Sequence, residues 1–422
     1  MTARPGSLDL PHRAYIEALA DAPEGSPSWH AIVAGYAALQ LFESWMDAGI
    51  GAATPTMLDV RRARRYVEAV PHVHPGRRCL TLLVDCIDAS AGGADFETID
   101  RRVEAGRLLA AYAKLLQYDA QWGLAADVHG TVVEFAQRTD DVARMLDSML
   151  MRGYSLRMQG RLGEATEAYA ALRAAAIAAG DERYRLESQL SDAKVAVDRG
   201  NVPMARELLD HTIAEARRLH CSVIVSKGLT DRARIAAMRG EHDLALACSF
   251  EALVLAEEAA DRERILSNIA LTFAQMGLRE SARDAALLVA ATAQDRNTRL
   301  TALVNLMEFA HQDRRELVFE HYRRDLAQEE LTPYLEAVYF ETCAEGFLAF
   351  GRAGEARAAA MRVLDVAEKH GLNEFVLKSE SLLHATGNAP AIAPTPAWPP
   401  TPETVSIVRA IAEMRIAAGL PG

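Results

Sequence analysis

Glycine recurs every 40 residues in the middle of this chain, and an alanine follows each glycine five positions later. The segments between them carry apolar residues at helical spacing, and no sustained alternation of apolar and polar residues indicates a strand. A fixed interval of this length predicts an array of small units that stack and share a core. The glycines are Gly160, Gly200 and Gly240, and the alanines are Ala165, Ala205 and Ala245.

The pattern extends from near residue 97 to near residue 386. In each unit we take the residue equivalent to Gly160 as the origin. Small residues tend to fall seven positions before this origin and five positions after it, where two helices must approach closely. The origins are Ala120, Gly160, Gly200, Gly240, Gly277, Gln312 and Gly351. The positions before them are Ala113, Gly153, Ala193, Ala233, Ala270, Asn305 and Ala344, and those after them are Ala125, Ala165, Ala205, Ala245, Ala282, Leu317 and Ala356. Each unit is therefore predicted to be two antiparallel helices, and the sixth unit departs from the pattern.

This pattern resembles the tetratricopeptide repeat (TPR), and Gly153, Gly160, Ala165 and Tyr169 form its clearest unit. A standard unit has about 34 residues, and a period near 40 is also found in HEAT and armadillo repeats. Because the spacing of small residue, glycine and alanine is the same in successive units, the pattern favours a long-helix TPR variant. The resemblance implies an all-α fold, a right-handed α-solenoid of about seven helix hairpins over residues 97–386.

Both ends of the chain lack this spacing. Residues 1–96 hold about four helix-like stretches and are predicted to form an N-terminal helical bundle that caps the first repeat; one stretch is expected to start at Thr54 and Pro55. Residues 387–402 are proline-rich and predict an extended linker. Residues 403–422 predict an amphipathic helix that either docks within the chain or binds a partner. Its apolar face is predicted to consist of Val405, Val408, Ile411 and Ala412, with Ile416 below.

Composition and charge exclude several classes of protein. Half of the 422 residues are apolar and a quarter are charged, as in ordinary globular proteins. The net charge of −12 disfavours nucleic-acid binding, which needs a positive field. We expect no membrane span and a cytoplasmic location, because no apolar stretch reaches bilayer length. Five scattered cysteines argue against a disulfide framework, and the scarcity of lysine relative to arginine suggests a GC-rich bacterial genome.

No motif nominates an enzyme or a cofactor site. Phosphate loops, dinucleotide-binding glycine motifs, zinc-protease and nucleophile-elbow motifs are all missing from the sequence. His72, His74, Cys79 and Cys86 lie close together, but their spacing matches no compact zinc knuckle, so we expect no metal. The run RRARR at 61–65 could hold phosphates. A helix with Ala63 and Val67 inward would instead expose these arginines to water, where they usually pair with carboxylates.

Family resemblance also suggests a binding surface. In TPR superhelices the first helix of each hairpin lines the concave groove, and positions counted from its small residue point inward. Applied to this sequence, the rule selects a mostly cationic set that would attract an acidic segment or a terminal carboxylate. The alternative is that these cations balance acids such as Asp147, Glu187 and Glu341 across the groove. The selected residues are Arg107, Lys114, Tyr154, Arg157, Lys194, Lys227, Arg234, Arg264 and Arg299.

Three functions are compatible with this sequence. The favoured one is a non-catalytic adaptor or scaffold that binds a protein or peptide in the groove. The second is a peptide-responsive regulator, because a helical bundle joined to repeats resembles the Rap-type regulators of bacteria in architecture. The third is an accessory subunit of an enzyme complex.

Overall fold

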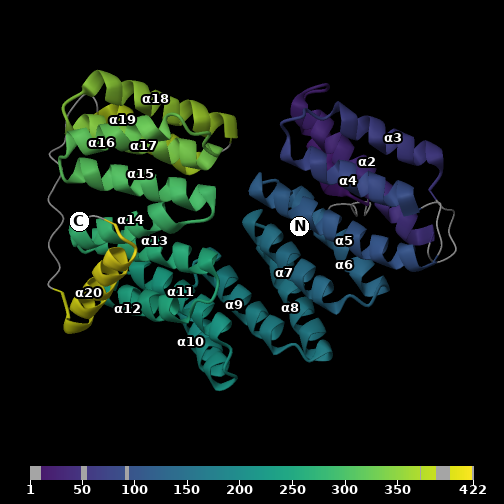
Figure 1. Ribbon diagram of the computed structural model, residues 1–422, viewed down its shortest axis with the longest axis horizontal. Coiled ribbons are helices and arrows are strands. Elements are labelled where there is room, and N and C mark those ends of the chain that lie inside the picture. The colour runs from purple at the N-terminus through teal and green to yellow at the C-terminus, as the bar shows by residue number, and fades with distance from the viewer. Residues whose placement is uncertain (1–10, 49–54, 91–94, 371, 386–399, 421–422) are drawn as a thin grey trace, which may run out of the picture. The chain divides into compact units, whose positions relative to one another are not determined.

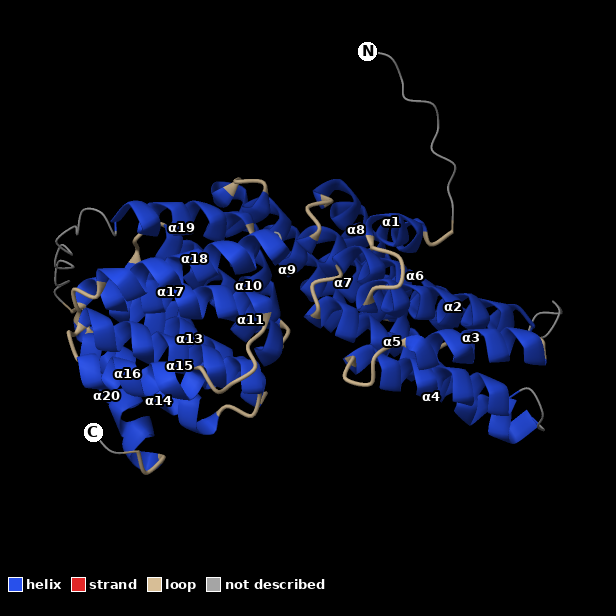
Figure 2. Ribbon diagram, turned by 90° about the horizontal axis from the view of Figure 1, so that it is seen from above, coloured by secondary structure: helices blue, strands red, loops and turns tan. Residues whose placement is uncertain are grey.

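The computed structural model describes residues 11–48, 55–90, 95–370, 372–385 and 400–420. Within these ranges every regular element is a helix, and none is a strand (Figure 2). The chain divides into two compact units, residues 1–208 and 209–422. The predicted all-α fold is thus confirmed. None of the described helices combines the length and the apolar character that spanning a bilayer requires.

The N-terminal unit begins with a helical bundle and continues as hairpins that pack one after another (Figure 1). The bundle helices are α1 (Arg13–Asp21), α2 (Pro27–Ala48), α3 (Met57–Ala69) and α4 (Pro75–Ser90). The hairpin helices are α5 (Asp95–Tyr118), α6 (Trp122–Arg138), α7 (Val142–Met158), α8 (Leu162–Ala179) and α9 (Glu182–Asp198). Helix α10 (Val202–Arg218) begins in this unit and ends in the next.

The C-terminal unit continues the same alternation, and its last helix returns to pack on earlier ones. Its first four helices are α11 (Ser222–Met238), α12 (His242–Leu255), α13 (Ala259–Gln275) and α14 (Arg279–Thr292). The next four are α15 (Arg296–Gln312), α16 (Glu316–Leu326), α17 (Pro333–Ala349) and α18 (Ala353–His370). The last two are α19 (Asn373–Ala385) and α20 (Pro402–Ala417).

The turns explain the periodicity of the sequence. From Ala120 to Gly240 a residue with positive φ ends a helix every 20 residues, so one repeat of 40 holds two such turns. At Gly160, φ is 78° and the next amide, of Arg161, donates to the carbonyl of Leu156 at 3.0 Å. Glycine adopts this left-handed conformation without a steric penalty. Asp140 and His220 adopt it as well, so two of the three turns between successive hairpins in this stretch carry no glycine signal, whereas Gly180 marks the third.

The bundle and the first hairpin share one core. Tyr15 of α1, Phe42 of α2 and Leu83 of α4 are buried in the same cluster as Leu109 of α5 and Val132 of α6. The predicted domain boundary at residues 96 and 97 therefore falls near the start of α5, beside a continuous core. Burial of this shared apolar surface supplies the main stabilisation of the bundle.

The predicted start of α3 is wrong by two residues. Thr54 lies outside the described residues, and the helix is capped by Thr56, whose hydroxyl accepts from the Asp59 amide at 3.3 Å. The Asp59 carboxylate accepts from the Thr56 amide at 2.8 Å, which completes a capping box.

The predicted frame of the sixth repeat is also wrong, by two residues. Gln312 is still helical, and the left-handed turn residue is Arg314, at φ 57°. With Arg314 as origin, the positions seven before and five after are Met307 and Phe319, which are both fully buried. Leu317, which occupied the later position in the predicted frame, is 85% exposed. Large side chains here take the places of small ones, which hid the correct frame.

Large side chains fit at the hairpin interfaces because glycines face them. A Cβ atom built at Gly346 of α17 would lie 2.3 Å from the Phe319 ring. A Cβ atom built at Gly153 of α7 would lie 2.4 Å from the ring of Tyr169, which is buried in α8. Gly153 makes room within one hairpin, between α7 and α8, and Gly346 makes room between successive hairpins, where the Phe319 ring of α16 meets α17.

Helix α20 packs on α12 and α14, the second helices of two successive hairpins (Figure 1). Its Thr404 hydroxyl donates to the Asp243 carboxylate at 2.7 Å, and Ile407 and Ile411 are buried. The predicted apolar face is only partly correct, because Val405 is 44% exposed and Ile416 is 66% exposed. The predicted linker falls almost entirely on residues 386–399, which lie outside the described residues.

Candidate partner-binding surface

In the N-terminal unit the predicted surface residues lie on α5, α7 and α9, the first helices of three successive hairpins. Helices α7 and α9 also pack directly against each other. Lys114, Tyr154 and Lys194 each follow the small residue of their helix and repeat at intervals of 40 residues. Lys114 is exposed, and the other two are half-buried. We call these three side chains the first-helix row.

Tyr154 is held rigidly at the middle of this row. The Trp122 ring meets the Tyr154 ring edge-on, with centroids 5.7 Å apart, and the Arg157 guanidinium lies 5.5 Å from the Tyr154 centroid. Arg157 itself donates to the Asp198 carboxylate at 2.7 Å. A tyrosine fixed in this way can contact a ligand with little loss of side-chain entropy.

Most of the predicted cations already have acidic neighbours. In the N-terminal unit the Arg107–Glu104 nitrogen–oxygen distance is 2.6 Å, and the Lys114–Asp147 distance is 3.6 Å. Lys194 and Lys227 also interact with neighbouring groups. Among the described residues, Arg299 of the C-terminal unit is exposed and shows no ion pair. In that same unit Arg234 lies 3.9 Å from Asp231, and Arg264 lies 2.8 Å from Asp261.

The first helices of the C-terminal unit also carry an acidic group that the prediction missed. Glu308 of α15 and Glu345 of α17 each follow the small-residue position of the corrected frame, and Glu341 occupies another groove position. Burial and the charges of Glu341 and Glu308 raise the pKa of Glu345 to about 7. Lys378 of α19 lies 3.1 Å from Glu341. In the wrong frame of the sixth repeat Glu308 does not follow the small-residue position, so the prediction missed it.

Two buried histidines stay neutral in the folded protein. His129 of α6 is fully buried, and burial lowers its pKa to about 3. Burial also lowers the pKa of His311 of α15 to about 4, and neither of its ring nitrogens has a hydrogen-bond partner in the described residues. Neither group has the ionisation needed for an acid–base role near neutral pH.

We expect acid to destabilise the N-terminal unit through His129. In the unfolded chain this imidazole has an ordinary pKa near 6.5, so it binds a proton there before it can do so in the folded state. Its contribution is therefore lost as the pH falls from about 6.5 towards 3, by roughly 3 kcal/mol at pH 4. The free energy of unfolding, measured against pH for the native chain and for His129→Leu, should fall less steeply in the variant. Equal slopes would contradict this assignment.

His12 has the opposite effect. Burial alone would lower its pKa, but hydrogen bonds to Asp127 of α6 and Glu43 of α2 outweigh burial and raise it to about 9. The two contacts measure 3.1 and 2.9 Å. Charged His12 therefore stabilises the bundle below about pH 6.5, and this contribution is lost as the pH rises towards 9.

His74, Cys79 and Cys86 each form a hydrogen bond with a different backbone group. The Cys79 thiol donates to the Leu108 carbonyl at 3.1 Å, and the Cys86 thiol donates to the Arg101 carbonyl at 3.3 Å. Burial raises the pKa of Cys79 to about 11, so this thiol stays protonated. The His74 ring nitrogen Nδ1 accepts from the Gly76 amide at 3.1 Å. In the described part of the chain, no three His, Cys, Asp or Glu side chains are grouped to hold a metal.

The same hairpin is repeated from α5 to α18, and each hairpin has a left-handed turn between its two helices. The positions before and after the turn hold small side chains, except in the sixth repeat. In the C-terminal unit the first helices α13, α15 and α17 pack in sequence against one another. The described chain is therefore an array of tandem helix hairpins. The steps between turn residues, from Gly240 through Gly277 and Arg314 to Gly351, are a uniform 37 residues, so even the irregular sixth repeat keeps the spacing.

Several solved structures are similar to this chain at low sequence identity. The chain is similar to the structure of pilF of Pseudomonas aeruginosa at 13% identity, over 58% of this chain and 98% of that chain, with a TM-score of 0.41. It is also similar to the TPR domain of P58(IPK), at 16% identity over 81% and 99% of the two chains, with a TM-score of 0.22. A circular tandem repeat protein matches at 13% identity over 93% and 100%, with a TM-score of 0.19. No family model matches the sequence, and no curated protein is significantly similar to it.

Proposed function

We propose that this chain is a non-catalytic scaffold that binds a segment of another protein along the first helices of its TPR-like repeats. The first-helix row supports this proposal most directly. Lys114, Tyr154 and Lys194 come from three successive hairpins at one equivalent position. Side chains that repeat regularly suit a linear ligand, extended or helical, because such a ligand also presents its side chains at regular spacing.

The charges of each unit suggest the chemistry of its ligand. For the N-terminal unit we propose an acidic segment or a terminal carboxylate, held by Lys114 and Lys194 beside the rigid Tyr154. The Lys114–Asp147 pair is exposed, and such a pair contributes only about 0–1 kcal/mol, so a ligand carboxylate can displace it at little cost. In the C-terminal unit α11 and α13 carry the predicted cations, and the following first helices α15 and α17 carry the acidic group. A ligand of this unit should therefore have both positive and negative side chains.

A photo-crosslinker tests where the partner binds. We expect the photoreactive residue p-benzoylphenylalanine at position 154 to capture one protein from cells of the source organism. The matched control replaces Ile177, which is 61% exposed on the second helix α8. If positions 154 and 177 capture the same set of proteins, the first helices are not the binding surface.

Charge reversal tests the proposed chemistry once that protein is identified. We expect Lys194→Glu to weaken binding by about tenfold and to reduce its salt dependence, because a ligand carboxylate would then face a like charge. Arg102→Glu is the matched control, since Arg102 is an exposed cation of α5 outside the first-helix row. Isothermal titration of both variants at two salt concentrations measures the difference. Equal affinities of Lys194→Glu and the native chain would rule out an acidic ligand at this row.

A further inference from the structure

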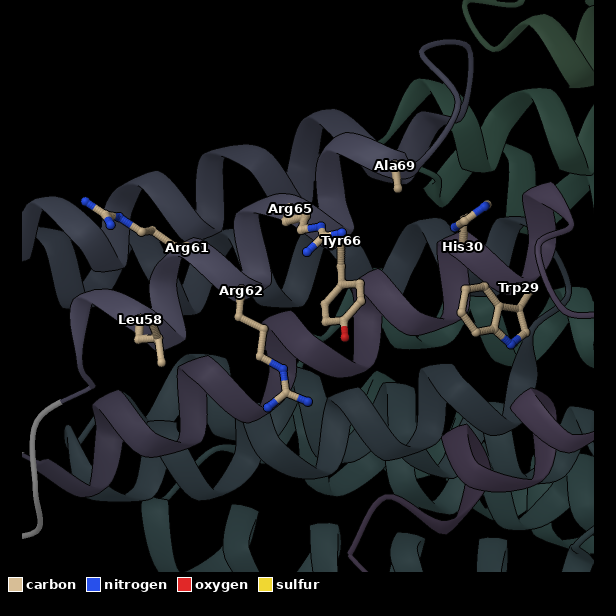
Figure 3. Close-up of a pocket in the computed structure, with 8 residues that line it drawn as sticks. All are labelled: Trp29, His30, Leu58, Arg61, Arg62, Arg65, Tyr66 and Ala69. Atoms are coloured by element: carbon tan, nitrogen blue, oxygen red, sulfur yellow. The ribbon is translucent and has the colours of Figure 1, made fainter.

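A pocket of about 530 Å³ lies between α2 and α3 in the N-terminal bundle (Figure 3). Its α3 residues recur at helical spacing on one side of that helix, and two further residues come from the start of α2. The volume falls within the range of small-molecule sites, roughly 300–1,000 Å³. We call it the α2–α3 pocket; it is lined by Trp29, His30, Leu58, Arg61, Arg62, Arg65, Tyr66 and Ala69.

Three arginines of this pocket, Arg61, Arg62 and Arg65, form no ion pair or hydrogen bond with the described residues. The neighbouring Arg64 turns the other way and pairs with Asp85 at 2.8 Å and Asp88 at 2.9 Å on α4. For the pocket arginines, the described residues show no ion pair. Asp59 of α3 accepts hydrogen bonds from Thr56, and these bonds together with the charge of Arg62 lower its pKa. The expectation that the RRARR run pairs with carboxylates therefore holds for one arginine but not for the three in the pocket.

The three pocket arginines show no ion pair with a described residue although the chain is acidic as a whole. Asp and Glu outnumber Lys and Arg by 58 to 46, so carboxylates are in excess. Like charges three or four positions apart on a helix repel each other by a few tenths of a kcal/mol. A second hollow of the N-terminal unit, of about 940 Å³, shows the usual arrangement, because two of its arginines, Arg13 and Arg161, pair with Glu17 and Glu164.

Aromatic rings complete the α2–α3 pocket. Figure 3 shows Tyr66 between the arginines on one side and Trp29 and His30 on the other. The Trp29 and His30 rings meet edge-on, with centroids 5.2 Å apart. Rings of this kind offer a stacking surface to a planar heterocycle, while guanidinium groups bind phosphate oxygens in pairs.

We propose that the α2–α3 pocket binds a nucleoside phosphate. Its base stacks on Trp29 or Tyr66, and its phosphate oxygens accept hydrogen bonds from Arg61, Arg62 and Arg65. A nucleoside phosphate combines a planar ring and closely spaced negative charges in one compact molecule. A peptide of acidic residues alone supplies carboxylates but no ring that could stack on Trp29 or Tyr66, and so matches this lining less well.

The nucleoside phosphate can be free or part of a single strand. A strand adds a negative charge with every nucleotide beyond the pocket, and the chain that it must approach has a net charge of −12. The charge balance therefore favours a free nucleotide. This proposal is independent of the partner-binding surface, which lies on other helices.

Calorimetric titration of the full-length chain with ATP, ADP, adenosine and pyrophosphate tests the proposal. We expect ATP and ADP to bind at least tenfold more tightly than adenosine or pyrophosphate, because only the nucleotides supply both the ring and the phosphates. Arg62→Gln, Arg65→Gln and Trp29→Leu should each weaken ATP binding by about tenfold. Arg78→Gln is the matched control, since Arg78 is an exposed arginine of α4 outside the pocket.

The remaining arms separate the sources of the ligand. Tighter binding of ATP than of a ten-residue oligothymidylate supports a free nucleotide, whereas the reverse order, still sensitive to Trp29→Leu, supports a single strand. Absence of ATP, ADP and oligonucleotide binding at millimolar concentration overturns the proposal. So does binding that only a glutamate-rich peptide shows, or nucleotide binding that the Arg62 and Arg65 substitutions leave unchanged.

Discussion

Gly153→Val is expected to destabilise the second hairpin strongly, by roughly 3 kcal/mol or more. The substituted Cβ would lie 2.4 Å from the ring of Tyr169, which is only 1% exposed. Valine also adds two methyl groups at this contact between α7 and α8. Hydrogen exchange of the α7 and α8 amides should accelerate by about a hundredfold, since 1.4 kcal/mol corresponds to a factor of ten.

The neighbouring hairpin supplies a control for this prediction. At the positions equivalent to Gly153 and Tyr169 it carries Ala193 and Leu209, both buried. The double substitution Gly153→Ala with Tyr169→Leu copies that pair, and we expect it to be more stable than Gly153→Ala alone. If the second substitution worsens the first, the contact is not a size match between the two side chains.

Ile411→Asp is expected to release the C-terminal helix. Ile411 is fully buried in α20, the helix that packs on α12 and α14. Loss of its side chain alone costs about 2–5 kcal/mol. An aspartate at the same place would also have to lose its hydration, so undocking of α20 becomes the cheaper outcome. Hydrogen exchange of residues 402–417 should therefore accelerate by at least a hundredfold, and protection in α12 and α14 should fall.

Val405→Asp is the matched control for this prediction. Val405 lies on the same helix but is 44% exposed, so a charge there keeps its water. We expect α20 to stay docked in this variant. Equal release in both variants would mean that the buried face of α20 does not hold it.

Much of the fold could be predicted because its turns carry a chemical signature. A left-handed turn favours glycine, so Gly160, Gly200 and Gly240 mark the helix ends directly. The frame of the sixth repeat was predicted wrongly because Arg314 adopts the same conformation without glycine, and Phe319 takes the place of an alanine. Its small partner is Gly346 in the following hairpin, which no spacing rule within one repeat can find.

The candidate sites were less predictable than the fold. Periodicity selects which residues lie on the first helices, but it does not say which acid each cation meets, as with Arg157 and Asp198, 41 positions apart. The RRARR run was visible from the start, yet its neighbours Trp29 and His30 come from another helix. The pairing of Arg64 with α4 and the exposure of Arg62 and Arg65 depend on how three helices pack.

The sequence by itself determined the helical class, the repeat interval and most turn positions, because these depend on local backbone preferences and on spacing within one hairpin. Tertiary structure decided the frame of the sixth repeat, the pairing of Lys114 with Asp147 and of Arg157 with Asp198, the docking of α20 on α12 and α14, and which α3 arginines line the α2–α3 pocket. Each of these depends on contacts between residues far apart in the chain, where burial and charge partners are set by packing.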